Sequence, residues 1–184
     1  MQVKGTAVKT IPEFIKDKHS DKYSGWFNQL PEKSKAIFQK GVAAPNWYPI
    51  EDAIITPTAL MSMHLFGNEK DGAWQCGRYS ADIALNGVYK IYVKMSSPGH
   101  IIDRAGRVLQ AYYEPSEITV VGRTDKSVTL HLVKFPKLHK VIEYRFAGWM
   151  ERALEISGCK NIRIDIPKSL TKGDTLSEFK ITWD

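Results

Sequence analysis

"SEITVVGRTDKSVTLHLVKF", residues 116–135, is the stretch that decides the fold class, because the spacing of apolar residues changes there. Upstream, apolar residues recur every three or four positions, which is typical of helices. Within the stretch they alternate with polar residues, which is typical of strands. A polar segment at 124–126 separates two such runs. We therefore predict a β-hairpin with one strand around 117–123 and a second around 127–134.

A helix and two further strands are predicted after the hairpin. Gly158 supplies a stop signal for the helix. "KNIRIDI" and "SEFKITW" alternate again and predict two strands. A hairpin, a crossover helix and two more strands predict a mainly antiparallel sheet of about four strands. The apolar face of the crossover helix "LHKVIEYRFAGWMERALEISG" is Ile142, Phe146, Trp149, Ala153 and Ile156.

Upstream of the hairpin, about the first 110 residues have helical patterns. Thr10 and Glu13 have capping-box spacing, which predicts that a helix starts at Thr10. "LPEKSKAIFQKG" predicts a short helix that ends at Gly41, and "TPTALMSMHLFG" predicts another. Apolar residues recur at helical intervals over 74–95, which predicts a long helix with a kink at Asn86-Gly87.

These patterns predict an α+β protein whose N-terminal helical layer packs on one face of the sheet. Ser97-Pro98 opens the last helix before the hairpin, and its apolar stripe ends at Tyr112. We divide the chain into an N-terminal helical extension, residues 1–29, and a single α+β ligand-binding-like domain, residues 30–184.

Composition limits the class of protein. The chain has 184 residues, of which 43% are hydrophobic, and a formal net charge of +6 at pH 7. A chain of this size buries about 70% of its unfolded surface, so it can form a packed core. Its lysines alternate with acidic residues, which indicates a solvated basic surface and no binding of nucleic acid.

The cysteines and the N-terminus indicate a compartment. Cys76 and Cys159 share no ligand spacing with a histidine, which favours buried free thiols and no metal site. The N-terminus lacks the apolar core of a signal peptide. No run approaches the roughly 20 apolar residues of a membrane span. We expect a cytoplasmic protein.

His64 lies four residues after Leu60, on an apolar helix face. A histidine among Met and Leu residues is what a haem pocket supplies as an axial ligand. The other interpretation is a core or boundary histidine that makes one hydrogen bond. One histidine on one helix favours the second interpretation. We therefore expect no haem and no other cofactor.

Tyr112 and Tyr113 end the helix before the hairpin, with Arg104 and Arg107 within two turns upstream. An arginine pair can grip a carboxylate or a phosphate. Such residues more often form a solvated helix face with aromatic residues sealing the core edge, and we expect this arrangement. Gly148 lies mid-helix, where glycine costs about 1 kcal/mol relative to alanine. Close packing of the helix on the sheet is the expected reason.

The C-terminal stretch "SLTKGDTLSEFKITWD", residues 169–184, combines a turn with a strand. Glycine and aspartate at 173–174 predict a tight turn. Ser169 and Ser177 flank this turn, and we expect a weak hydrogen bond between them. The strand that follows directs three alternating apolar residues to the core: Phe179, Ile181 and Trp183.

This stretch also carries a family resemblance. The pattern Ser-x3-Gly-Asp-x2-Ser-Glu-Phe-x-Ile from Ser169 to Ile181 resembles the C-terminal motif of four-vinyl-reductase-type (4VR) domains, Cys-x3-Gly-Asp-x2-Cys-x-Phe. The unit "GWMERALEISGCKNIRIDI" looks like their helix–glycine–strand unit. With "LPEKSKAIF", "NWYPI" and "SSPGHIIDRAGRVLQAYYEP", the chain from about residue 30 resembles a bacterial family related to those domains.

The resemblance implies a superfamily fold that includes the haem nitric-oxide-binding domains and the TRAPP vesicle-tethering subunits. These have helices on an antiparallel sheet, often with an apolar cavity, and they sense small molecules or dock as dimers. Ser169 and Ser177 replace both motif cysteines, and a neutral hydroxyl is a poor zinc ligand, so thiolate chemistry is not expected. The Tyr-x-Ser-x-Arg signature that holds haem propionates in the haem domains is absent as well.

We predict a non-enzymatic small-molecule-binding or sensory domain of bacterial type. Its apolar cavity is expected between the helix 142–156 and the sheet, because aromatic residues are abundant on faces that should converge. It would take an apolar small molecule and signal through a partner protein or its own oligomeric state. The expected lining residues are Tyr112, Leu130, Phe146, Trp149 and Met150.

Two alternatives remain at this stage. The first is a homodimeric docking module whose exposed patch is formed by N-terminal aromatic residues, namely Trp26, Phe27, Trp47 and Tyr48. The second is an enzyme, for which the chain shows no local catalytic motif such as G-x-S-x-G or H-E-x-x-H. It rests on family analogy alone.

Overall fold

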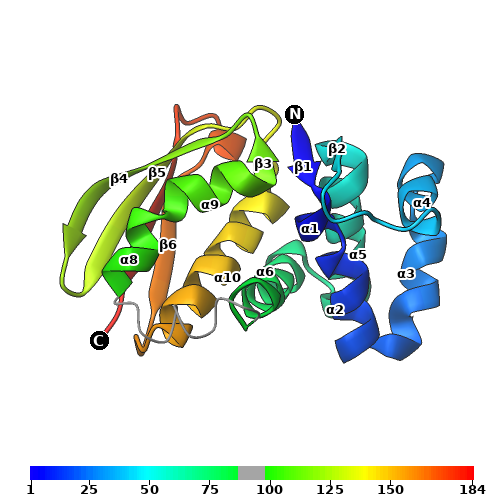
Figure 1. Cartoon of the computed structure of the whole chain (residues 1–184), viewed down its shortest axis with the longest axis horizontal. Coiled ribbons are helices and arrows are strands. Elements are labelled where there is room, and N and C mark those ends of the chain that lie inside the picture. Colours follow the sequence, from blue (N-terminus) through cyan, green and yellow to red (C-terminus); the bar gives the residue numbers. More distant parts are fainter. Residues whose placement is uncertain (87–97) are drawn as a thin grey trace.

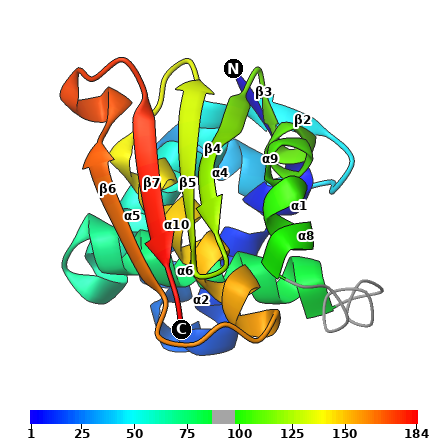
Figure 2. The same ribbon diagram turned by 90° about the vertical axis from the view of Figure 1, so that its left-hand side faces the viewer.

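The computed structural model describes residues 1–86 and 98–184, and within them it shows helices and two antiparallel sheets (Figure 1). The larger sheet contains the predicted hairpin, formed by β4 (Glu117–Thr124) and β5 (Ser127–Lys134). β7 (Ser177–Thr182) pairs with β5, and β6 (Arg163–Lys168) pairs with β7. The order is β4-β5-β7-β6, with every pair antiparallel (Figure 2). The predicted α+β class is confirmed.

One face of this sheet is apolar and lies against α10 (Lys140–Ile156), as Figures 1 and 2 show. The strand register places Leu130 opposite Val120 on one side and Phe179 on the other, so apolar positions of neighbouring strands share this face. Full burial of one such side chain contributes about 1.5–3 kcal/mol. The buried centre of the face consists of Val128, Leu130, Leu132, Phe179 and Ile181.

The helices between Gly5 and Asn86 form a layer on the far side of α10 from the sheet (Figure 1). The predicted helix end at Gly41 is confirmed, because Gly41 follows the last turn with φ of +79°, which favours glycine. Gly67 follows α5 in the same way with φ of +71°. These helices are α1 (Gly5–Val8), α2 (Thr10–Lys18), α3 (Tyr23–Gln29), α4 (Glu32–Gln39), α5 (Thr56–Phe66) and α6 (Glu69–Asn86). Short 3-10 and π turns occur at Ser20–Lys22, Glu51–Ile55 and Leu170–Lys172.

Three details of the predicted helices need comment. The capping box at Thr10 is wrong, since the Thr10 hydroxyl donates to the carbonyl oxygen of Ala7 at 2.7 Å and does not cap α2. The predicted long helix is present as α6, whereas its part beyond Asn86, the kink at Asn86-Gly87 and the cap at Ser97 lie outside the described residues. The last helix before the hairpin is divided into α8 (Pro98–Asp103) and α9 (Ala105–Tyr112).

A second, smaller sheet was not predicted. β1 (Gln2–Lys4) lies between β2 (Trp47–Pro49) and β3 (Tyr113–Glu114), and both pairs are antiparallel. Val3 and Trp26 have no exposed surface and belong to the same apolar cluster as the large sheet. Residues 1–29 thus pack into the common core, while the boundary at residue 29 stays a prediction.

Helices α6 and α10 cross at two glycines. A Cβ atom on Gly77 would lie 2.2 Å from the carbonyl oxygen of Arg145, and one on Gly148 would lie 2.1 Å from that of Trp74. Both distances are far below van der Waals contact, so only glycine allows this approach. The close packing predicted at Gly148 is therefore present, but the neighbour is α6, and the predicted sheet neighbour is wrong.

Two further expectations concern the compartment. Cys76 and Cys159 are free and buried, as predicted. Within the described ranges, no helix is both long and apolar enough to traverse a lipid bilayer.

Candidate ligand-binding site

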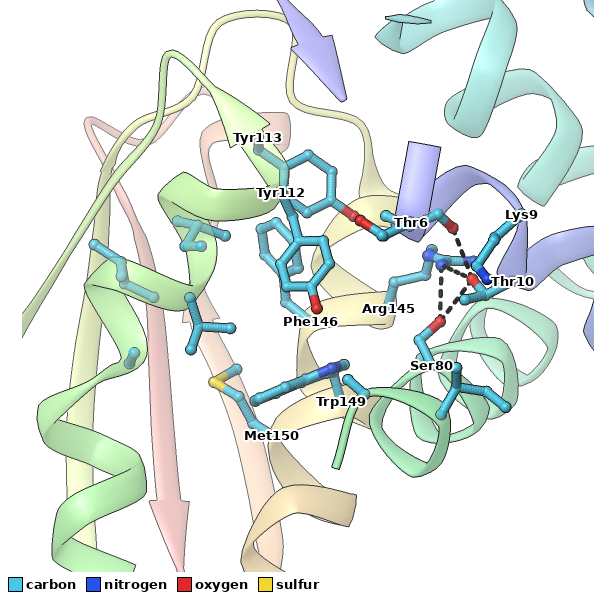
Figure 3. Close-up of a pocket in the computed structure, with 18 residues that line it drawn as sticks. Thr6, Lys9, Thr10, Ser80, Tyr112, Tyr113, Arg145, Phe146, Trp149 and Met150 are labelled. Atoms are coloured by element: carbon cyan, nitrogen blue, oxygen red, sulfur yellow. Dashed lines mark hydrogen bonds between the residues drawn. The ribbon is translucent and has the colours of Figure 1, made fainter. Parts of the chain in front are cut away.

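A cavity of about 260 Å³ lies on the helical side of α10 (Figure 3). Its walls come from α1, α2, α6, α9 and α10, and Tyr113 of β3 and Ile118 of β4 also line it. The close α6–α10 crossing forms part of this wall, since Gly77 is a lining residue. The aliphatic part of the lining is Ala7, Ala84, Ala105, Val108, Leu109 and Ile118, with Ile83 partly exposed to solvent.

Four of the five predicted lining residues border this cavity: Tyr112, Phe146, Trp149 and Met150. Leu130 does not, because it lies on the inner face of the sheet, 2% exposed, between Val120 and Phe179. The expected position between α10 and the large sheet is met only at one edge, where Ile118 of β4 lines the cavity. The cavity lies instead among helices, where α9 and the N-terminal helices face α10 (Figure 3).

The aromatic wall is held rigidly. Phe146 packs edge-to-face on Tyr113 and on Phe135, with ring centroids 5.1 Å and 5.6 Å away. Such pairs contribute about 0.5–1.5 kcal/mol beyond their buried area. Burial raises the pKa of the Tyr113 phenol, against a smaller opposing effect of Arg145, so the phenol is neutral at physiological pH.

The cavity wall also carries a buried cation that sequence reasoning missed. Arg145 is 3% exposed and lines the cavity. Its Nη1 donates to Cys76 Sγ at 2.7 Å, and its Nη2 donates to Thr10 Oγ1 at 3.1 Å and Ser80 Oγ at 3.0 Å (Figure 3). The sequence did contain a signal for this buried cation. Arg145 is three residues after Ile142 and four before Trp149, which places it on the apolar stripe of the helix.

The partners of Arg145 are neutral. Burial is the largest influence on the Cys76 thiol and raises its pKa, although Arg145 acts in the opposite direction. Throughout residues 1–86 and 98–184, no carboxylate forms an ion pair with Arg145. A second cation, Lys9, also lines the cavity and lies 3.6 Å from a carboxylate oxygen of Glu13.

Other predicted sites lie away from the cavity. His64 Nδ1 is 3.0 Å from Gln29 Nε2, which confirms a boundary histidine with one hydrogen bond. Arg104 and Arg107 are exposed and do not line the cavity, while Tyr113 is buried, so the expected solvated helix face with an aromatic seal is confirmed.

The predicted docking patch is not an exposed aromatic surface. Trp26 has no exposed surface, and its Nε1 donates to the carbonyl oxygen of Pro57 at 3.0 Å. The Lys4 Nζ covers the ring of Trp47 at 4.6 Å from its centroid. Phe27, Trp47 and Tyr48 are half-buried. The patch is therefore wrong for Trp26, and dimer formation stays a prediction.

The C-terminal serines converge on a buried carboxylate, Glu143 of α10, which is 3% exposed. Ser169 Oγ donates to this carboxylate at 2.8 Å, and Ser177 Oγ donates to its Oε1. The expected bond between the two serines is thus replaced by bonds to Glu143. The tight turn is confirmed, because Gly173 has φ of +93° and the Ser169 amide donates to Asp174 Oδ2 at 2.7 Å. Glu143, Ser169 and Ser177 do not line the cavity beside α10.

Neither a protein-family model nor a curated protein matches this sequence. Solved structures do match it. An unliganded Fe(II) H-NOX protein from K. algicida has a TM-score of 0.73 and 14% identity, covering 98% of this chain and 96% of that chain. The Fe(II)NO form of an H-NOX protein from S. oneidensis has a TM-score of 0.75 and 14% identity, covering 98% and 99%. The IWP-051-bound Fe(II)CO H-NOX from Shewanella woodyi has a TM-score of 0.68 and 15% identity, covering 97% and 93%.

These iron-bearing neighbours make haem the group that the fold implies, and the residues of the cavity do not fit it. Haem iron is held mostly by histidine or cysteine. Neither type lines the cavity in the described part of the chain, and the stretch 87–97 contains neither. A volume of about 260 Å³ is also below the roughly 300–1,000 Å³ of pockets for drug-sized ligands. The chain has the fold of the H-NOX proteins, with a cavity whose side chains do not match a haem pocket.

Proposed function

We propose that this chain is a non-enzymatic sensory domain that binds a small, mostly apolar molecule in the cavity beside α10. The observation that carries the proposal is a largely apolar cavity of about 260 Å³ with Tyr112, Phe146, Trp149 and Met150 in its walls. An apolar cavity of about 150 Å³ binds benzene, and pockets for drug-sized ligands begin at about 300 Å³. The ligand is therefore larger than benzene and smaller than a typical drug.

The lining supports binding more than catalysis. General acid–base chemistry uses imidazole or carboxyl groups most often. In the described segments, the lining includes neither of these groups. It consists of aliphatic and aromatic side chains with a few hydroxyls and two cations, which is the composition of a binding pocket with few polar anchors.

The position of the cavity suggests how occupancy is transmitted. Its walls join α1 and α2 of the N-terminal layer to α9 and α10, which adjoin the large sheet (Figure 1). A ligand that contacts both sides changes the relative stability of their arrangements by its differential affinity for them. The output then passes to a partner protein or to the oligomeric state of the chain.

The test is native against denaturing mass spectrometry of the purified chain, followed by titration with octanol as a neutral apolar probe. We expect a retained small molecule, or a raised melting temperature with octanol. The Ala105→Trp variant, which fills the cavity, should lose both effects. Ala36→Trp is the matched control, because Ala36 is exposed on α4. Absence of a retained molecule together with no response to octanol would overturn the proposal.

Leu130→Ala separates the cavity from the core. Deletion of a buried leucine side chain costs about 2–5 kcal/mol of stability, and Leu130 is 2% exposed. Because Leu130 does not line the cavity, the dissociation constant for octanol should stay unchanged. A weakened affinity for octanol in folded Leu130→Ala protein would place the binding site between α10 and the sheet.

A further inference from the structure

Arg145 is a buried positive charge without an anionic partner in the described residues. An arginine side chain is always charged in proteins. A buried charge is costly unless it is paired and hydrogen-bonded. The observed partners supply hydrogen-bond acceptors but no compensating charge.

These partners are also committed elsewhere. The Thr10 hydroxyl donates its hydrogen to the carbonyl oxygen of Ala7 at 2.7 Å. The Ser80 hydroxyl likewise donates its hydrogen to the carbonyl oxygen of Cys76 at 2.8 Å. The third partner, Cys76, is fully buried. The group of Thr10, Ser80 and Cys76 therefore fixes the direction of the guanidinium without neutralising it.

The charge faces an apolar cavity. Two cations, Arg145 and Lys9, line it, while no acidic side chain of the described residues does. In such surroundings the effective dielectric constant is low, so an added negative charge interacts strongly with the guanidinium. Figure 3 shows the guanidinium of Arg145 beside Thr10 and Ser80 on one side, Met150 on the other side, and the ring of Trp149 between them.

We propose that the ligand is an amphipathic monoanion, whose carboxylate pairs with Arg145 and whose apolar body lies against Trp149 and Met150. This inference rests on the proposed function and names its ligand class. A carboxylate matches the planar fork of a guanidinium and accepts two parallel hydrogen bonds from it. The apolar walls leave no group to pair a second negative charge other than Lys9, which already lies 3.6 Å from Glu13.

The experiment compares octanoate with octanamide by calorimetric titration of the wild-type chain. The two probes share their apolar body and differ in charge. We expect octanoate to bind at least about tenfold more tightly, the factor that one charge-assisted hydrogen bond supplies. Equal affinities would overturn the carboxylate inference while leaving the proposed function intact. No binding of either probe would overturn both. Tighter binding of octyl sulfate than of octanoate would overturn the assignment to carboxylates.

Two variants locate the anion site. Arg145→Met should remove the preference for octanoate over octanamide while octanamide still binds. Arg107→Met is the matched control, because Arg107 is exposed on α9 and does not line the cavity, and it should keep the full preference. A preference that persists in folded Arg145→Met protein would overturn the role of Arg145. Should that variant not fold, Arg145→Lys keeps the charge without the fork and should lower the preference severalfold, and an unchanged preference would count against the pairing.

Discussion

Helix α10 carries two buried charges, Glu143 and Arg145, whose surroundings differ in kind. Glu143 lies near the start of α10 and accepts hydrogen bonds from Ser169, Ser177 and Thr171, all in or beside the turn between β6 and β7. Arg145 lies on the cavity side and donates to α2 and α6. Each residue is 3% exposed, so burial alone does not distinguish them.

The difference lies in whether the network is closed. Ser177 Oγ accepts from the Leu170 amide at 2.9 Å and donates to Glu143, so the carboxylate joins α10 to the turn through a complete set of bonds. Arg145 borders an open volume of about 260 Å³. A buried charge in a closed network stabilises the fold, whereas one beside a cavity is available to a ligand.

The largest effect is expected for Glu143→Met, which should lower the free energy of unfolding by about 3 kcal/mol. The hydroxyls of Ser169 and Ser177 lose their charged acceptor, and a buried donor without a partner costs about 1–3 kcal/mol. Urea unfolding measures the change. Glu32→Met is the control, since the Glu32 side chain is 91% exposed. A loss below about 1 kcal/mol would show that the network adds little.

Ser177→Ala should cost about 2 kcal/mol, because the Leu170 amide loses its acceptor and Glu143 loses a donor. Ser177→Cys should cost less, since a thiol keeps a weak donor and a weak acceptor at the same place. The comparison of the two variants by urea unfolding tests this. Equal losses for both would mean that packing rather than hydrogen bonding decides the residue at position 177.

Arg145→Met should change the stability of the ligand-free chain by less than about 1 kcal/mol. A buried charge without a counter-charge is costly, and replacement by an apolar side chain of similar length removes that cost. Thr10 and Ser80 also keep their backbone acceptors. Urea unfolding of Arg145→Met and Glu143→Met under the same conditions measures the two changes in stability. A loss as large as that of Glu143→Met would make Arg145 a structural residue and contradict the contrast drawn here.

The smallest effect concerns the exposed side of α10, where Arg78 holds Glu155 by two bonds of 2.9 Å and 2.8 Å. Burial acts to raise the pKa of Glu155, but hydrogen bonds from Arg78 and Arg152 outweigh it and lower that pKa. Because the folded pKa lies below the unfolded value of about 4.3, the stabilisation is present above that pH. It is lost as the pH falls through the folded pKa.

The expected loss is below about 1 kcal/mol, because the side chains of Arg78 and Glu155 are 24% and 31% exposed and water screens the pair. Glu155→Gln should flatten the dependence of stability on pH below about pH 4.3. Chemical unfolding at a series of acidic pH values measures it. An unchanged slope in the variant would assign the acid response to other carboxylates.

The large sheet and the helices were predictable because their signals are local. The alternation over 116–135 and in the two later strands depends on residues a few positions apart, and so does the stripe of α10. The small sheet was not predictable in this way. Its strands have two or three residues each and come from positions near 2, 48 and 113. None of them is long enough for an alternation of apolar and polar residues to be recognised.

The candidate site was predictable only in part. Abundant aromatic residues at the end of α9 and in the middle of α10 pointed to Tyr112, Phe146 and Trp149, with Met150 beside them. Leu130 does not border this cavity, because alternation shows that a strand residue faces the core but does not show which groups surround it there. Arg145 lies on the same helix stripe, and its significance depends on which groups α2 and α6 bring to it.

The sequence by itself determined the α+β class, the hairpin, the extent of α10 and the turn at 173–174, since each follows from spacing or from backbone preferences over a few residues. Only the tertiary structure decided that the two serines meet Glu143 and that Arg145 faces a cavity. Those contacts join residues from 26 to 135 positions apart. The contacts of Arg145 with Cys76 and Ser80 also need the close approach of α6 and α10 at Gly77 and Gly148, which no local pattern specifies.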